Sequence, residues 1–164
     1  MKAIRLIALA ACMAATLDAS AQEQEIRLFS HRGGRMEHDE NTLSAFQASY
    51  DAGYRGFETD IRMTRDGALV ITHDSSLERT TDGTGTVEEK TEAEIRQLAT
   101  KQGNKMMFLD ELLEFLKGKE GLYVEFEMKT KPVELYPEER LHAYCDKLYD
   151  AVMAVKPADA VFVF

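Results

Sequence analysis

The sequence has few of the features that mark several classes of protein. Its 164 residues include only two cysteines, which is too few for a fold held together by disulfides. Its 20 basic side chains are outnumbered by 29 acidic ones and form no basic stripe, which argues against a nucleic-acid binder. The chain also lacks internal repeats, low-complexity tracts and domain linkers. What it does have, 45% apolar residues, is enough for the core of one soluble globular domain.

The apolar run at the start of the chain is too short to cross a membrane as a helix. It covers the 12 residues 6–17, whereas a transmembrane helix needs about 20. A basic start precedes the run, and the small residues Ala19 and Ala21 follow it at the spacing that signal peptidase reads. We therefore expect residues 1–21 to be a signal peptide and the mature protein to be secreted or periplasmic. A lipoprotein anchor at Cys12 is the minor alternative.

Beyond residue 21, segments of strand and helix character alternate. The patterns predict strands over residues 26–30, 56–61, 68–72, 122–128 and 160–164. They predict helices over residues 41–53, 91–98, 108–116 and 137–155. Strand and helix in repetition favour an α/β fold with a parallel sheet, and such a sheet is normally covered by helices on both faces.

Carboxylates alternate with apolar residues along two of these strands. Glu58 and Asp60 share one face of the second strand, because side chains on a strand alternate between its faces. Glu125, Glu127 and Lys129 share one face of a later strand in the same way. Three carboxylates converging from two parallel strands would form a site for a hard divalent cation, calcium or magnesium. A solvent-facing strand edge is the simpler alternative.

Two histidines are expected at the ends of strands. His31 and Arg32 follow the first strand, and His73 follows the third. The carboxyl ends of strands are where parallel sheets place their ligands. Two imidazoles beside one cation can divide the work of general base and general acid, and the Arg32 guanidinium suits phosphate oxygens. Taken alone, either histidine could instead be a loop residue that bonds the backbone and has no catalytic role.

The spacing of these residues matches a known family pattern. In chain order the matching segments are His31-Arg32-Gly33, Glu40-Asn41-Thr42, Glu58-Thr59-Asp60, Thr64-Arg65-Asp66-Gly67, His73-Asp74, Arg79-Thr80-Thr81 and Glu127-Met128-Lys129. Together they resemble the signature of the glycerophosphodiester phosphodiesterase family over about residues 26–129. Two departures stand out, since Asp39 replaces a proline that is usual in the family and Glu125 adds an unexpected carboxylate.

The resemblance implies a role for each matching residue. These roles are acid/base catalysis for His31 and His73, binding of one divalent cation (Ca²⁺ or Mg²⁺) for Glu58, Asp60 and Glu127, and phosphate binding for Arg32 and Lys129. The implied reaction is metal-dependent hydrolysis of small glycerophosphodiesters to glycerol 3-phosphate and an alcohol. A related phospholipase D acting on intact lipids is an alternative. We expect no nucleic acid as a binding partner and no transmembrane segment in the chain.

The family fold sets an expectation about length. The resemblance implies a (β/α)8 TIM barrel, which typically needs about 250 residues. Residues 22–164 number 143, which is room for about the first half of that barrel. We therefore expect residues 22–164 to be a C-terminally incomplete glycerophosphodiester phosphodiesterase domain whose open sheet edges allow self-association. A truncated, non-catalytic remnant that binds metal or phosphate is the other alternative.

Overall fold

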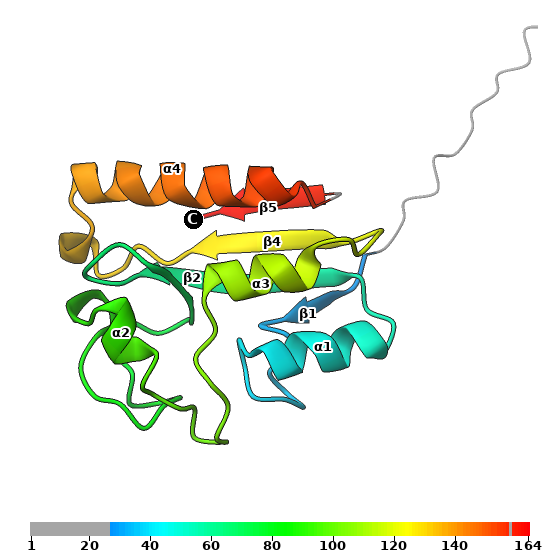
Figure 1. Cartoon of the computed structure of the whole chain (residues 1–164), viewed down its shortest axis with the longest axis horizontal. Coiled ribbons are helices and arrows are strands. Elements are labelled where there is room, and N and C mark those ends of the chain that lie inside the picture. Colours follow the sequence, from blue (N-terminus) through cyan, green and yellow to red (C-terminus); the bar gives the residue numbers. More distant parts are fainter. Residues whose placement is uncertain (1–26, 158) are drawn as a thin grey trace, which may run out of the picture.

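A four-stranded parallel sheet organises the chain, in the order β1-β2-β4-β5, with β3 added antiparallel to β2 (Figure 1). The computed structural model describes residues 27–157 and 159–164, so the expected signal peptide lies outside the described residues. The strands are β1 (Phe29–His31), β2 (Gly56–Met63), β3 (Leu69–Ile71), β4 (Tyr123–Met128) and β5 (Asp159–Val163). The helices are α1 (Leu43–Asp51), α2 (Glu92–Ile95), α3 (Leu109–Leu116) and α4 (Glu138–Val155), with 3-10 turns η1 (Val87–Glu89) and η2 (Val133–Leu135).

The local sequence explains where the helices begin and end. The Thr42 hydroxyl accepts the Ala45 amide at 3.3 Å and caps α1, and Gly53 closes the turn after it at a φ of +96°. Thr91 and Glu94 form a reciprocal capping box at the start of α2, a pairing that the spacing of the two residues favours. The helix expected over residues 91–98 is shorter than predicted, because after Ile95 the backbone continues in turns that close over three residues.

The strand expected over residues 68–72 is present, but the expectation that it joins the sheet as a parallel strand is wrong. β3 runs antiparallel to β2, with Ile71 opposite Ile61. A parallel crossover needs a dozen or more residues, whereas the Asp66-Gly67 turn joins β2 to β3 directly. The chain therefore doubles back, and the Thr72 amide donates to the Asp60 carbonyl at 2.9 Å. This reversal returns residue 73 to the level of Asp60.

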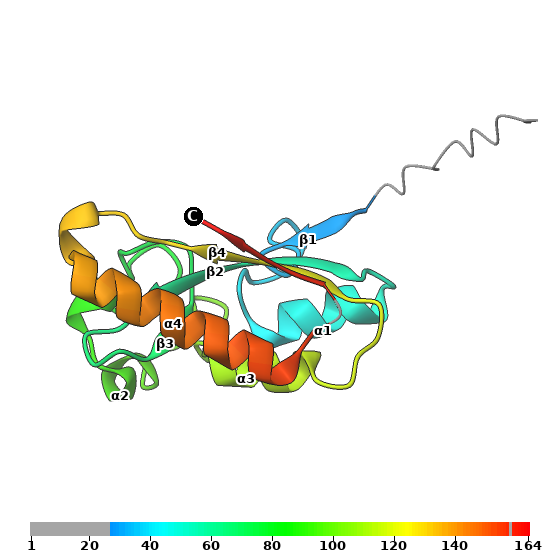
Figure 2. The same ribbon diagram turned by 90° about the horizontal axis from the view of Figure 1, so that it is seen from above.

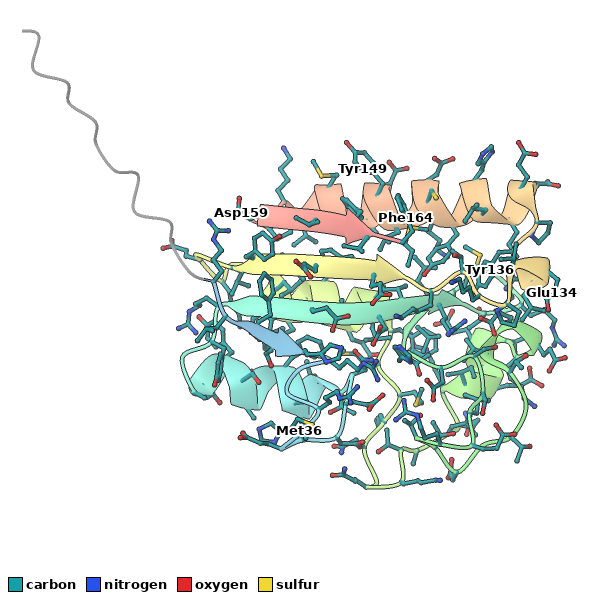
Figure 3. All side chains as sticks on the ribbon, turned by 180° about the vertical axis from the view of Figure 1, so that it is seen from behind. Met36, Glu134, Tyr136, Tyr149, Asp159 and Phe164 are labelled. Carbon is teal, nitrogen blue, oxygen red and sulfur yellow. The ribbon has the colours of Figure 1, made fainter. Side chains whose placement is uncertain are left out.

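Helices cover only one face of the sheet, so the expectation of cover on both faces is wrong. Seen from above, α1, α3 and α4 lie on the same side of the parallel strands (Figure 2). Phe57, Ile61, Val124 and Phe126 point toward these helices and are fully buried. The opposite face, which we call the inner face, is polar and is seen in Figure 3 with α3 behind it. A parallel sheet with helices on its outer face alone is the arrangement of a TIM barrel wall.

No helix within residues 27–157 or 159–164 has the length and apolar character needed to cross a membrane.

Candidate functional site

Three carboxylates gather on the inner face of β2 and β4. Glu58 and Asp60 come from β2, and the parallel register places Glu127 of β4 directly opposite Asp60. One ligand oxygen from each of the three residues lies within 4.8 Å of the other two. Asp60 is fully buried and Glu58 is nearly so, and Oε1 of Glu58 has no hydrogen-bond partner among the described residues. A buried, oxygen-only group with an unsatisfied oxygen fits a hard divalent cation.

Burial and the neighbouring carboxylates shift the protonation of Glu58. Burial, the negative charge of Asp60 and, to a smaller extent, that of Glu127 together raise the pKa of Glu58 to about 7, although the hydrogen bond from the Arg32 amide acts to lower it. Without a cation, the group therefore holds a proton near neutral pH. A bound cation would displace that proton, because metal ligands are deprotonated.

Two basic side chains flank the carboxylates. Arg32 follows β1 in the left-handed region at a φ of +54°, and its amide donates to Glu58 Oε2 at 2.9 Å. Its Nε lies 3.1 Å from Asp60 Oδ2. On the other side Lys129 Nζ lies 3.1 Å from Asp60 Oδ1 and contacts the Glu127 carboxylate. The inner face therefore carries basic groups that could bind an anion on both sides of a carboxylate group that could bind a cation.

His31 ends β1 beside the same carboxylates. Its Nε2 lies 3.6 Å from Oε2 of Glu58, and about half of the side chain is exposed. Burial lowers the pKa of His31, and the positive charges of Arg32 and Arg35 lower it further. The ring is therefore held in its neutral form near neutral pH, with a nitrogen that can accept a proton.

His73 lies beside the site because β3 doubles back, so that the preceding residue, Thr72, bonds the Asp60 carbonyl and the charge of His73 acts on His31. Its Nδ1 lies 2.6 Å from Oδ1 of Asp74, and its backbone carbonyl accepts from Nε of Arg62 at 2.9 Å. Arg62 is itself buried and pairs with the Glu88 carboxylate at 2.7 Å. The seven residues expected at the site therefore lie on the parallel strands or in the loops that directly follow strands. They are His31, Arg32, Glu58, Asp60, His73, Glu127 and Lys129.

The structure adds residues to which the sequence assigned no role. Asn41 sits at a φ of +58°, and its Nδ2 donates to Oδ2 of Asp60 at 2.9 Å. The Glu40 carboxylate contacts both Arg32 and Arg79. For Glu40 and Arg79, the only signal in the sequence was that each lies in a segment matching the family pattern. Glu125 stays outside the three-carboxylate group, and the Tyr123 hydroxyl donates to it at 3.3 Å.

Fold and site together define an α/β protein of the TIM-barrel type, with carboxylates that could hold a cation and basic side chains that could hold an anion near the carboxyl ends of its strands. Residues 31–160 match the model of the glycerophosphoryl diester phosphodiesterase family, and the chain belongs to that family. The family expected from the sequence is therefore confirmed.

Similar proteins agree with this assignment. A glycerophosphodiester phosphodiesterase of Caldanaerobacter subterraneus is 37% identical over 123 residues, which cover 70% of this chain and 50% of the relative. The crystal structure of a glycerophosphoryl diester phosphodiesterase from Silicibacter pomeroyi, reported as putative, superposes with a TM-score of 0.75 at 26% identity. A phosphodiesterase of Oleispira antarctica, solved in complex with the product sn-glycerol-3-phosphate, superposes with a TM-score of 0.71 at 27% identity.

The match covers only part of these proteins. For both structures the superposition takes in 84% of this chain and 56% of the neighbour. The chain spans about half the length of the curated relatives it matches. Its sheet accordingly corresponds to part of a TIM barrel.

Proposed function

We propose that this chain hydrolyses small glycerophosphodiesters to glycerol 3-phosphate and an alcohol, with the help of one divalent cation. The observation that carries the proposal is the three-carboxylate group flanked by two basic side chains and approached by two histidines. Membership of the glycerophosphoryl diester phosphodiesterase family supports the reaction. The product found in the Oleispira antarctica phosphodiesterase supports the choice of substrate.

The carboxylates and the basic side chains would divide the charges of the substrate. Glu58, Asp60 and Glu127 would hold Ca²⁺ or Mg²⁺, which when bound supplies positive charge that polarises the phosphoryl group. Arg32 and Lys129 would contact the phosphate oxygens, where negative charge grows as the reaction proceeds. Both side chains already lie 3.1 Å from Asp60, so they are held in place before a substrate arrives.

The two histidines would move the protons. One imidazole takes the proton of the attacking oxygen, which is water or the neighbouring hydroxyl of the glycerol, as the new P–O bond forms. The other gives a proton to the leaving alcohol as the old P–O bond breaks. The lowered pKa of His31 favours the first role for His31, and His73 then takes the second.

Release of glycerol 3-phosphate from glycerophosphocholine by the full chain tests this function. The assay is run with Ca²⁺, with Mg²⁺ and with chelator. We expect activity that needs a cation and that falls by at least about 10²-fold in His31→Ala and in His73→Ala. His142→Ala, an exposed histidine on α4, is the matched control and should retain activity. A folded wild-type chain that releases no product with either cation would overturn the proposal.

Intact lipids are the competing substrates. The same assay with lysophosphatidylcholine or sphingomyelin vesicles separates hydrolysis of small glycerophosphodiesters from hydrolysis of intact lipids. Faster release of choline from the vesicles than glycerol 3-phosphate from glycerophosphocholine would assign the chain to the phospholipase D type of activity.

Two further properties extend the proposal. We infer that residues 1–21 direct secretion, which N-terminal sequencing of the protein from the extracellular or periplasmic fraction would test.

We also infer self-association through the sheet edges, since β1 and β5 are each paired on one side only among the described strands. Light scattering of the purified chain would show a monomer if this second inference is wrong.

A further inference from the structure

A continuous series of charged contacts links His73 to the buried Asp60. Asp74 contacts the His73 ring on one side and the Arg79 guanidinium on the other. Arg79 reaches Glu40, Glu40 reaches Arg32, and Arg32 reaches Asp60. The proposed mechanism uses both ends of this series but leaves the middle of it, Arg79 and Glu40, without a role.

Arg79 makes the contacts that hold the series together. Its Nε contacts the Asp74 carboxylate, and its two terminal nitrogens donate to the two oxygens of Glu40 at 2.6 and 3.1 Å. Such a planar fork between two carboxylates fixes geometry in a way that a lysine ammonium cannot. An isolated ion pair at the surface usually contributes little. Here, however, Oε1 of Glu40 also accepts from the buried Arg32, so the half-exposed Arg79 has a fixed support.

The geometry around His73 leaves the orientation of its ring to Asp74. The Arg62 bond holds the His73 backbone carbonyl, but it does not hold the ring. Only Asp74, at 2.6 Å from Nδ1, contacts a ring nitrogen within hydrogen-bond distance among the described residues. Although burial acts to raise the pKa of Asp74, hydrogen bonds from Arg79 and His73 lower it to about 2. An ionised carboxylate can only accept, so Nδ1 carries a proton in both the neutral and the charged ring, and Nε2 is left as the nitrogen that takes up and gives away the exchanging proton.

We propose that Arg79, supported by Glu40, is a positioning residue that holds Asp74 against Nδ1 of His73 and so presents Nε2 to the reacting phosphodiester. Arg79 itself touches neither substrate nor cation in this assignment. The role for Nε2 rests on the proposed function, whereas the orientation and tautomer of the ring do not. The two can therefore be tested separately.

The first test reads the tautomer of His73 and needs no activity. Full chains carrying ¹⁵N-labelled histidine are compared at alkaline pH as wild type, Arg79→Met and the control Arg65→Met, with the His73 signals assigned from a His73→Gln chain. Arg65 is a fair control because it also pairs with a glutamate, Glu94 at 3.5 Å, on an exposed loop. We expect one ring tautomer, protonated at Nδ1, in the wild type and the control. In Arg79→Met we expect the two tautomers to mix.

The second test reads catalysis. Arg79→Met should lower kcat for glycerophosphocholine by about 10- to 100-fold, the size usual for residues one contact away from the reacting groups, with KM changed by less than about threefold. Methylguanidinium added to Arg79→Ala should restore part of kcat, and it should restore nothing in His73→Ala. Glu40→Gln should also lower kcat, but by less, since Asp74 still holds Arg79. Because Glu40 also pairs with Arg32, this variant weakens a proposed phosphate contact as well, and only the direction of its kcat change bears on Arg79.

The outcomes separate the two proposals. An unchanged His73 tautomer in folded Arg79→Met overturns the positioning role, and so does an unchanged kcat in that variant. A tautomer that shifts in Arg79→Met, in a chain whose wild type releases no glycerol 3-phosphate, leaves the positioning role standing and rejects the proposed function. If Arg79→Met does not fold, Arg79→Lys gives the same test. Its ammonium can neutralise charge but cannot span Asp74 and Glu40 together, so we expect the tautomers to mix there too.

Discussion

The two faces of β2 are buried alike but differ in chemistry. Phe57 and Asp60 are both fully buried, yet they point to opposite sides of the same strand. The Phe57 ring packs against Phe46 and Phe115, with ring centroids at 5.6 and 6.2 Å. Asp60 instead meets Arg32 and other polar groups of the inner face.

The difference teaches how one strand serves both stability and chemistry. Apolar groups gain free energy by leaving water, so the helix-facing side stabilises the fold. Charged groups lose free energy there unless they are paired, and pairing on the inner face is incomplete, as the unpartnered Glu58 Oε1 shows. We therefore expect substitutions on the helix-facing side to change stability at any pH, and those on the inner face to change cation binding and the dependence of stability on pH.

The largest effect is expected from Phe57→Ala. The change removes a fully buried ring and leaves a cavity, so it should lower the free energy of unfolding by about 3–5 kcal/mol. Urea unfolding measures this. Phe164→Ala removes a ring that is 84% exposed and should stay within about 0.5 kcal/mol of wild type. A loss below about 1 kcal/mol for Phe57→Ala would contradict the division between the faces.

The next effect is a dependence of stability on pH that comes from the inner face. The pKa of Glu58 is about 7 in the folded chain and 4.5 ordinarily, so between these values the folded state binds the extra proton. In the presence of chelator, the contribution of Glu58 to the free energy of unfolding should therefore fall as pH rises from about 4.5 to 7, by up to about 3 kcal/mol.

Unfolding of wild type and Glu58→Gln across this pH range isolates the contribution. The difference in free energy of unfolding between the two chains should fall as pH rises. Excess Ca²⁺ or Mg²⁺ should reduce or reverse this fall, because the cation binds the ionised carboxylates. Parallel pH profiles for the two chains would show that Glu58 titrates normally.

Glu127→Gln should separate cation binding from stability. Losing one of three ligand carboxylates should weaken binding of Ca²⁺ or Mg²⁺ by about 10- to 100-fold, which is about 1.4 to 2.8 kcal/mol. Unfolding in chelator should change by less than about 1 kcal/mol, since Glu127 is only partly buried. Calorimetric titration measures the binding, and Glu134→Gln, an exposed glutamate on η2, is the control. Equal affinities in the two variants would remove Glu127 from the site.

The smallest effect is expected at the boundary between the faces. Thr42 caps α1 immediately after Asn41, which bonds Asp60. Thr42→Ala should cost about 1 kcal/mol of stability, and Thr42→Ser, which keeps the hydroxyl, should cost less. Cation affinity should stay as in wild type. A large loss of affinity in Thr42→Ala would show that the cap and the inner face are coupled through Asn41.

Much of the site could be predicted from the sequence because its signals are local. The alternation of acidic and apolar residues along β2 and β4 assigns each side chain to a face, and this was enough to suggest that carboxylates of the two strands converge. The structure gathers Glu58, Asp60 and Glu127 and leaves Glu125 out. The places of His31, Arg32 and His73 after strands suggested their roles, and the family pattern added the choice of Glu127 as a metal ligand and the phosphate role of Lys129. The series through Arg79 and Glu40 escaped prediction, because it joins loops 39 residues apart whose approach no local pattern encodes.

By itself, the sequence determined which segments become strands and helices, where α1 and α2 begin, and which residues share a face. Periodicity and capping act over a few residues, so a linear pattern suffices for them. Only the tertiary structure decided that β3 returns antiparallel and brings His73 to the site, and that Glu127 stands opposite Asp60. It also decided that helices cover one face alone (Figure 2). These features depend on hydrogen bonds and packing between segments far apart in the chain, whose partners are chosen only when the whole sheet forms.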